Sequence, residues 1–373
     1  MALVSCLHNA MSADPAMRAE SHAALESAQA QPGAVLAFLD VLTAPGLAPD
    51  GALLAVLCAK NAVDRRWAPS RRGAAAAAGE PISAEEKAGV RVRLVRIAID
   101  ALDERIAAHA ALALARAARV DGASGESAEL LPALLDASAR ADAEASVRGL
   151  RALHRVVKEL ASRRLLPHKR EFCALAPCVA DAVGQLFARH AQAALGAAGD
   201  GAGVLDGPGA VRALAAAALC AKTQRQLLVH GFVGLRTDGA DAGRGAAVRL
   251  HADTAAAALP ALSGMLGGGA RAGARAEAAT RLARAVLKLV AQAHERHGEA
   301  ALGAQMICWL LFVMFPRWAA IGASALKRAS SNCAWPRAAI VPIVSMSCFL
   351  MRAVASIGLT PISAYILRTP CAA

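Results

Sequence analysis

Residues 144–160 read EASVRGLRALHRVVKEL, and this stretch indicates the fold. Its large apolar side chains recur at spacings of three and four, which places them on one face of an α-helix and leaves charged residues on the other. The apolar face is carried by Val147, Leu150, Leu153, Val156, Val157 and Leu160. A helix with one apolar stripe of this width is not stable alone, so we expect it to pack on helices of the same kind.

The same pattern recurs along the first 300 residues. Short breaks at Pro, Gly, Asp or Ser separate the helical segments. We expect helices over residues 14–30, 34–42, 50–67, 103–120, 126–138, 144–160, 168–194, 208–229, 251–266 and 272–297, with a further helix beginning after residue 83. Residues 71–79, 195–208 and 236–248 are rich in small residues and are expected to form loops or insertions.

Two helix starts carry clear local signals. Asp14 followed by Pro15 fits an N-cap residue and a first-turn proline. Ser83, with Glu86 three positions later, fits a capping box at the start of the next long helix. These signals fix where the helices begin and support the helical interpretation of the segments behind them.

The composition favours helix throughout. Alanine dominates, aromatic residues are only 3%, and runs of strand-favouring residues are scarce before residue 300. The helices pair at intervals near the ~40–47 residues of HEAT and armadillo repeats. The sequence therefore predicts an all-α, HEAT/armadillo-type α-solenoid of antiparallel helix pairs, wound as a right-handed superhelix.

The net charge of +12 raises nucleic acid and anionic membranes as partners. Residues 301–373, however, contain six basic residues and no Asp or Glu, so the first 300 residues are only mildly basic. Aromatic groups for base stacking are nearly absent before residue 300. The apolar runs in residues 301–373 are shorter than the ~20 residues of a membrane span. We therefore expect no direct nucleic-acid partner and no membrane partner.

Catalytic and metal-binding motifs are not recognised. The nine cysteines lack the paired spacing of a zinc site and follow no recognised signal sequence, so we interpret them as reduced thiols of an intracellular protein. Residues 294–297 read HERH and lack the i, i+4 histidines of a zinc protease helix. Residues 207–209 read GPG but follow no strand, unlike a dinucleotide-binding turn. We expect a binding protein without cofactor or metal, and not an enzyme.

Several short motifs, taken in order, resemble the importin-beta superfamily and within it the importin eleven subfamily. They are the QPG of residues 31–33, the LAVL of residues 54–57, the VDRRW of residues 63–67, the ISAEEK of residues 82–87, the ELLPAL of residues 129–134, the LHRVVKELASRRL of residues 153–165 and the RQLLVHGFV of residues 225–233. Each motif is weak alone, but their order and spacing extend over about 250 residues. The basic insertion at 71–79 and the basic overall charge depart from the family pattern.

The resemblance implies a nuclear transport receptor of the cytoplasm, nucleus and nuclear pore. Such receptors bind the small GTPase Ran in its GTP form on their N-terminal repeats, which disfavours cargo bound by later repeats. They also bind FG-repeat nucleoporins between outer helices and a cargo protein, here unknown. If the inner-face helices contact Ran, the candidate contact residues are Glu85, Glu86, Arg91 and Glu129, for which capping or a solvated helix face is the alternative role.

The resemblance also implies an organisation of the chain. We expect a first helix region in residues 1–24, importin N-terminal-type HEAT repeats in 25–100, further repeats with Gly/Ala-rich insertions in 101–300, and an atypical basic, apolar tail in 301–373 outside the solenoid. Family members are about three times longer, so the chain corresponds to an N-terminal third. The alternative function is a generic helical-repeat scaffold without Ran switching, with or without a membrane tail anchor in 301–373.

Overall fold

The computed structural model describes residues 2–43, 46–68, 80–122, 129–196, 208–232, 241–262 and 273–297. Over these ranges the chain is almost entirely helical and contains no β-strand. All of them belong to one compact unit, Met1–Ile307. The predicted all-α class is confirmed.

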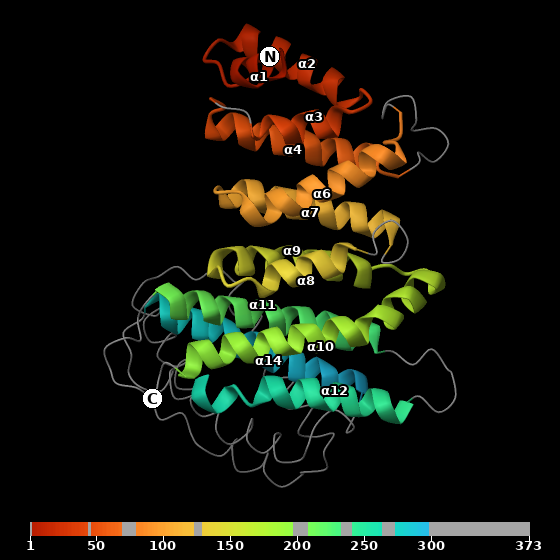
Figure 1. Cartoon of the computed structure of the whole chain (residues 1–373), viewed down its shortest axis with the longest axis vertical. Coiled ribbons are helices and arrows are strands. Elements are labelled where there is room, and N and C mark those ends of the chain that lie inside the picture. Colours follow the sequence, from red (N-terminus) through yellow and green to blue (C-terminus); the bar gives the residue numbers. More distant parts are fainter. Residues whose placement is uncertain are drawn as a thin grey trace, which may run out of the picture. The chain divides into compact units, whose positions relative to one another are not determined.

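The described helices are α1 (Ala2–Asn9), α2 (Pro15–Gln29), α3 (Ala34–Val41), α4 (Pro49–Arg66), α6 (Ala84–Asp100), α7 (Glu104–Asp121), α8 (Leu130–Ala139), α9 (Ala143–Ala161), α10 (Leu166–Gly196), α11 (Pro208–Gly231), α12 (Asp241–Ala256) and α14 (Ala274–His297). Short turns connect α1 to α2, α2 to α3, α6 to α7, α8 to α9 and α9 to α10 (Figure 1).

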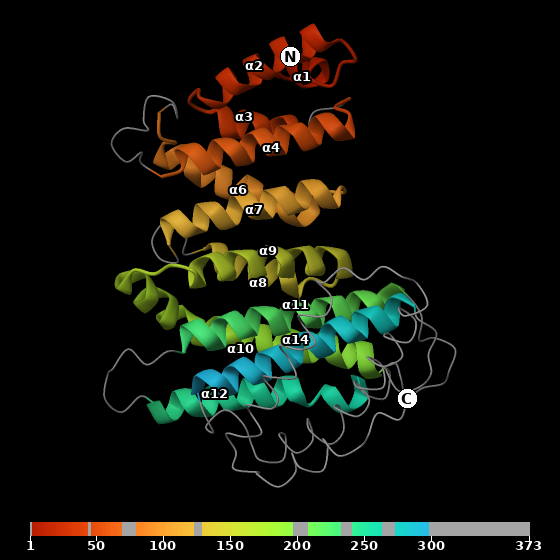
Figure 2. The same cartoon turned by 180° about the vertical axis from the view of Figure 1, so that it is seen from behind.

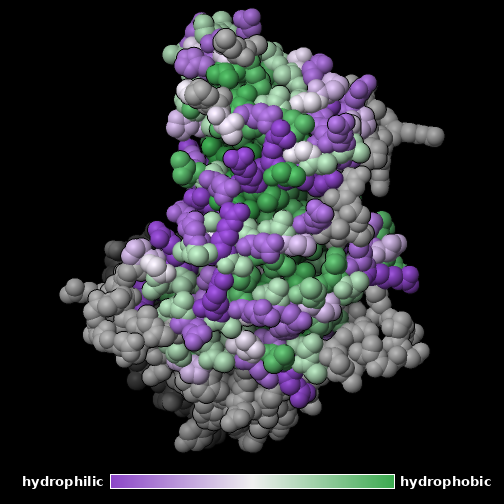
Figure 3. All heavy atoms as spheres, in the orientation of Figure 1, coloured by the Kyte–Doolittle hydropathy of each residue, from purple (hydrophilic) through white to green (hydrophobic). Residues whose placement is uncertain are grey.

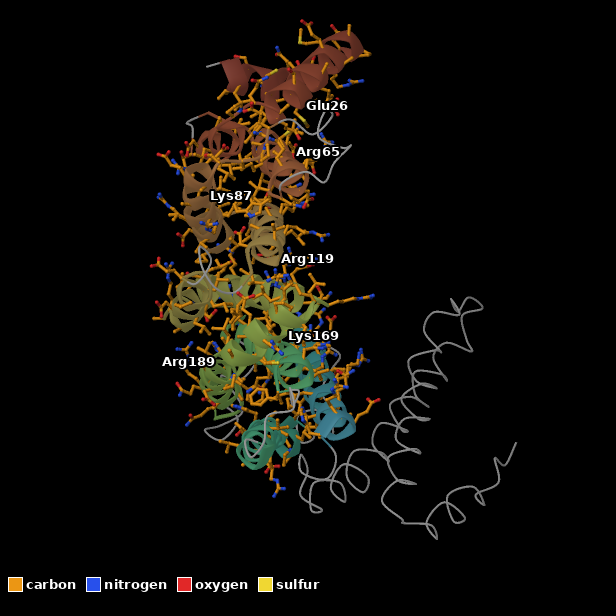
Figure 4. The ribbon with its side chains drawn as sticks, turned by 90° about the vertical axis from the view of Figure 1, so that its right-hand side faces the viewer. Glu26, Arg65, Lys87, Arg119, Lys169 and Arg189 are labelled. Atoms are coloured by element: carbon orange, nitrogen blue, oxygen red, sulfur yellow. The ribbon has the colours of Figure 1, made fainter. Side chains whose placement is uncertain are left out.

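After α1 and α2 the helices stack in two columns. The first column contains α4, α7, α9, α11 and α14, and each helix packs on the next in this order. The second column contains α3, α6, α8, α10 and α12, and each of these helices packs on one first-column helix. Figure 1 looks onto the second column, Figure 2 onto the first, and Figure 4 shows both from the side. This two-layer stack of helix pairs is the architecture of an α-solenoid.

Small residues allow the two columns to approach closely. Helix α7 buries Ala110, Ala113 and Ala117 beside Leu114, all with 0% exposure. At Gly149 of α9, a Cβ atom would lie only 2.9 Å from a backbone nitrogen of α8. Alanine and glycine thus give thin, tightly packed layers instead of one thick core.

Two segments differ from the prediction. Helix α1 was not predicted, and its Leu7 is completely buried. Residues 236–248 were predicted as a loop, but α12 begins at Asp241 and ends at Ala256, before the predicted end of that helix. The glycines of this segment were weighted too strongly, because its alanines favour helix. The predicted loop at 71–79 and tail at 301–373 lie outside the described residues.

Candidate binding surface

The start of α6 contains Glu85 and Glu86, two of the predicted contact residues. Ser83 is the N-cap, and its Oγ accepts a hydrogen bond from the Glu86 N–H at 3.1 Å. In a complete capping box the glutamate carboxylate would bond back to the N-cap backbone. The Glu86 carboxylate instead accepts a hydrogen bond from the N–H of Gly33 at 3.0 Å, and the residue is only 7% exposed. Glu85 is exposed to solvent.

Arg66 at the end of α4 also contacts the turn between α2 and α3. It is 3% exposed, and its Nη1 donates to the carbonyl oxygens of Gln29 and Gln31, each at 2.8 Å. Its Nε donates to the carbonyl of Glu80 at 2.6 Å. The turn between α2 and α3 is therefore fixed by one charged side chain from α4 and one from α6.

A third polar contact joins α4, α6 and α7. The indole of Trp67 is buried, and its Nε1–H donates to Asp121 Oδ1 at 2.8 Å. Arg91 Nη1 donates to Asp121 Oδ2 at 2.9 Å, forming an ion pair in which both side chains are about nine-tenths buried. Lys87 and Arg91 lie over the Trp67 ring, 5.6 and 6.0 Å from its centroid. We call Trp67, Arg91 and Asp121 the Asp121 node.

The four predicted contact residues therefore fall into two groups. Glu85 and Glu129 are exposed and stand at the starts of α6 and α8, neighbouring helices of the second column. Glu86 and Arg91 are occupied by contacts inside the fold, as described above. Only Glu85 and Glu129 of the four are candidates for surface contacts, because a side chain held in an internal hydrogen bond is not free to bind a partner.

The motifs that carried the resemblance to transport receptors form these connections. The Trp67 ring is part of the core, with 1% exposure. The long-range contacts of Asp121, Arg66 and Gly33 were not predicted from the sequence. The signal for Asp121 was weak, because its partners lie 30 and 54 residues away along the chain and local periodicity does not report such pairs.

The outer face of the second column has a mixed character. Figure 3 shows hydrophilic and hydrophobic side chains interspersed over it. Several charges on this face are paired, as in Arg93 with Asp40 at 2.5 Å and Arg140 with Asp100 at 3.1 Å. Val92 of α6 is an apolar exception, with 70% exposure. Such a face suits a protein partner, for which bulk hydrophobicity is not the distinguishing signal.

Among the described residues, Leu166–Ala194 is long and apolar enough to cross a membrane, and 44% of its most apolar window is buried. This segment lies in α10, which packs on α11, α12 and α8, so we interpret its apolar side as core. Within the described ranges, no group of three or more His, Cys, Asp or Glu side chains could hold a metal ion.

The sequence matches a known domain family at its N-terminal end. Residues 21–100 match the importin-beta N-terminal domain, which runs from within α2 to the end of α6. The chain is 30% identical over 233 residues to importin-11 of Mus musculus and to importin-11 of Homo sapiens. The match covers 62% of this chain and 22% of each relative, so the chain spans about a fifth of their length.

Solved structures share the fold at low sequence identity. Lph2, described as a bidirectional nuclear transport receptor of S. cerevisiae, has a TM-score of 0.54 and 18% identity, covering 79% of this chain and 27% of its own. The exportin Cse1 in its cargo-free, cytoplasmic state has a TM-score of 0.53 and 12% identity, covering 84% of this chain and 36% of its own. Both are similar in architecture to the helical stack described here.

The domain match, the similarity to importin-11 and the shared fold agree with one another, and the predicted resemblance is confirmed at the level of the superfamily. The comparisons support a member of the importin-beta superfamily, because the family model matches residues 21–100 and importin-11 of both species is similar over 233 residues.

Proposed function

We propose that this chain binds the small GTPase Ran in its GTP form and takes part in protein import into the nucleus. One observation supports the proposal: the matched domain, residues 21–100, contains the helices α3, α4 and α6. The connections of these helices are fixed by Arg66, Glu86 and the Asp121 node. A binding surface needs such a rigid frame, since side chains held in place lose less entropy on binding.

The proposed contact residues are Glu85 and Glu129. Both carboxylates are exposed at the starts of neighbouring second-column helices, where basic side chains of a partner could reach them. Exposed charges at the edge of an interface chiefly set association rate and partner choice. We therefore expect them to steer Ran onto the second column, with Val92 supplying an apolar contact on the same helix as Glu85.

Further partners follow from the superfamily. Cargo remains unidentified, and the chain spans only 22% of importin-11, so we place the main cargo surface in repeats that the relatives have beyond this match. For FG-repeat nucleoporins, an apolar pocket of about 410 Å³ between α1, α2 and α3 offers room for a phenyl ring. It is lined by Leu3, Leu25 and Phe38 among others. We propose a cytoplasmic and nuclear location with passage through the pore.

The deciding experiment is a pull-down of the full chain with Ran loaded with a non-hydrolysable GTP analogue or with GDP. Selective retention of the GTP form supports the proposal. Equal or absent binding by a chain with normal helical circular dichroism would instead favour the alternative, a helical-repeat scaffold without Ran switching.

A matched pair of variants locates the contact. The double substitution Glu85→Lys with Glu129→Lys is expected to weaken Ran-GTP binding by about tenfold, from two lost favourable charge contacts and two new repulsions. The control is Glu20→Lys with Glu26→Lys, which changes the same net charge on exposed positions of α2. Similar weakening in both variants would mean that net charge, and not the second-column edge, governs binding.

A further inference from the structure

The exposed side of three successive first-column helices is basic. Helices α9, α11 and α14 lie side by side (Figure 2). The His154 ring and the Thr223 hydroxyl, 3.3 Å apart, join α9 to α11, and His297 lies 2.8 Å from the Leu228 carbonyl oxygen between α11 and α14. Five cations lie along this side: Arg155 and Lys158 on α9, Lys222 and Arg225 on α11, and Lys288 on α14. We call these five residues the basic strip.

The cations of the strip lack the acidic partners that cations of α4 and α7 have. There, Lys60 pairs with Asp64 at 3.2 Å and Arg119 with Glu159 at 3.0 Å. In the described part of the chain, no carboxylate lies within the 4.0 Å of an ion pair from any of the strip's five cations. Arg155 donates only to a backbone carbonyl, that of Ala108.

The positive charges of the strip repel one another, which destabilises their charged forms. Partial desolvation lowers the pKa of Lys222, and the charges of Arg225, Arg281 and Lys288 lower it further. Burial likewise lowers the pKa of His154 to about 4, with Lys222 and Arg225 acting in the same direction. Arg225 Nε is buried without a hydrogen-bond partner. A buried donor without a partner costs stability.

We infer that the basic strip docks a short acidic segment of a partner protein, with carboxylates held by Lys222 and Arg225. The guanidinium fork of arginine matches a carboxylate in bidentate geometry. The segment cannot be residues 301–373 of this chain, because they contain no Asp or Glu. We propose a segment of another protein as the partner, and its docking here is a function separate from the proposed Ran binding on the second column.

The surroundings of the strip favour a peptide over a nucleic acid. Helices α9 and α14 also contain the carboxylates Glu159, Glu277 and Glu295. A nucleic acid is bound along extended basic tracks, whereas a peptide with a few carboxylates needs only a short cluster of cations. Helices α9, α11 and α14 contain no Phe, Tyr or Trp, so they offer bases no stacking platform.

The test measures binding by the full chain, without Ran, through fluorescence anisotropy at about 0.1 M salt, where the Debye length is ~10 Å. The probe is a fluorescein-labelled peptide of Asp and Glu alternating with Ser and Gly. Comparators are a peptide with Lys replacing the acids and a single-stranded oligonucleotide. The strip variant is Lys222→Ser with Lys288→Ser, both exposed positions. The control, Arg65→Ser with Arg96→Ser, removes the same charge from exposed sites outside the strip.

We expect the acidic peptide to bind and the strip variant to bind it about tenfold more weakly, with the control within about twofold of the parent. Equal losses in both variants would overturn the inference, since net charge alone would then explain binding. Tighter binding of the oligonucleotide, lost in the strip variant, would also overturn it by assigning the strip to nucleic acid. Circular dichroism of each variant verifies that the fold is kept.

Discussion

Replacing Asp121 by alanine tests whether the Asp121 node holds the first repeats together. The substitution removes the acceptor of the Trp67 indole and the partner of Arg91, both largely buried. Each hydrogen bond to a charged group contributes about 1.5 kcal/mol, which gives a loss of about 3 kcal/mol. That value lies at the lower end of the about 3–5 kcal/mol expected when one partner of a buried ion pair is removed.

Because solenoid repeats are stabilised by their neighbours, the loss should appear locally. Hydrogen exchange is the appropriate assay, with peptides from α4, α6 and α7 compared with peptides from α11 and α14. A loss of about 3 kcal/mol raises the opening equilibrium of the first group roughly a hundredfold, while the second group stays unchanged. The control Asp136→Ala changes an exposed carboxylate on α8 and should stay within about 0.5 kcal/mol of the parent. Exchange rates for Asp121→Ala equal to those of the control would refute the reasoning.

Three further outcomes are expected. In Gly231→Ala the new methyl group would overlap that of Ala176, which should destabilise α11 by about 1–3 kcal/mol. In Gly209→Ala the new Cβ has no atom within 4 Å, so this substitution should stabilise the same helix by about 0.5–1 kcal/mol. Urea unfolding compares the two variants, and equal effects would contradict the packing. Gly33→Ala should cost about 1 kcal/mol from backbone strain alone, since its φ is +73° and its surroundings are open; an unchanged midpoint would speak against this. Burial lowers the pKa of His154 to about 4 in the folded chain, from an ordinary value of 6.5, so its contribution to the free energy of unfolding is complete above pH 6.5 and is lost as the pH falls toward 4. On acid titration, His154→Gln should therefore lose less stability than the parent. An unchanged stability profile would exclude this histidine as the cause.

The helices were largely predictable because their signals are local. Asp14 was predicted as an N-cap, and its side chain accepts a hydrogen bond from the Ala16 N–H at 2.9 Å. Ser83 likewise caps α6. The second half of that capping box was not predictable, because Glu86 bonds to Gly33, a residue 53 positions away. Side-chain partners at such separations depend on how the helices stack, which a single sequence does not encode in its periodicity.

The candidate surfaces were predictable to a smaller extent. Glu85 and Glu129 were chosen from the starts of expected helices, and exposure at those positions follows from helix geometry. The basic strip was missed, since the sequence shows mixed charges along each helix. Its cations come together only when α9, α11 and α14 are aligned by contacts such as that between His154 and Thr223.

The position of the Asp121 node has a mechanical consequence. Trp67 follows the C-terminal end of α4 and Asp121 ends α7, so the node fastens two successive layers of the stack at one edge. A superhelix changes its pitch or curvature when neighbouring layers tilt against each other. At the opposite edge, where α4 and α7 begin, the exposed pair of Arg105 and Asp50 at 3.8 Å is a weaker connection. Flexing of these first repeats is therefore directed toward the opposite edge.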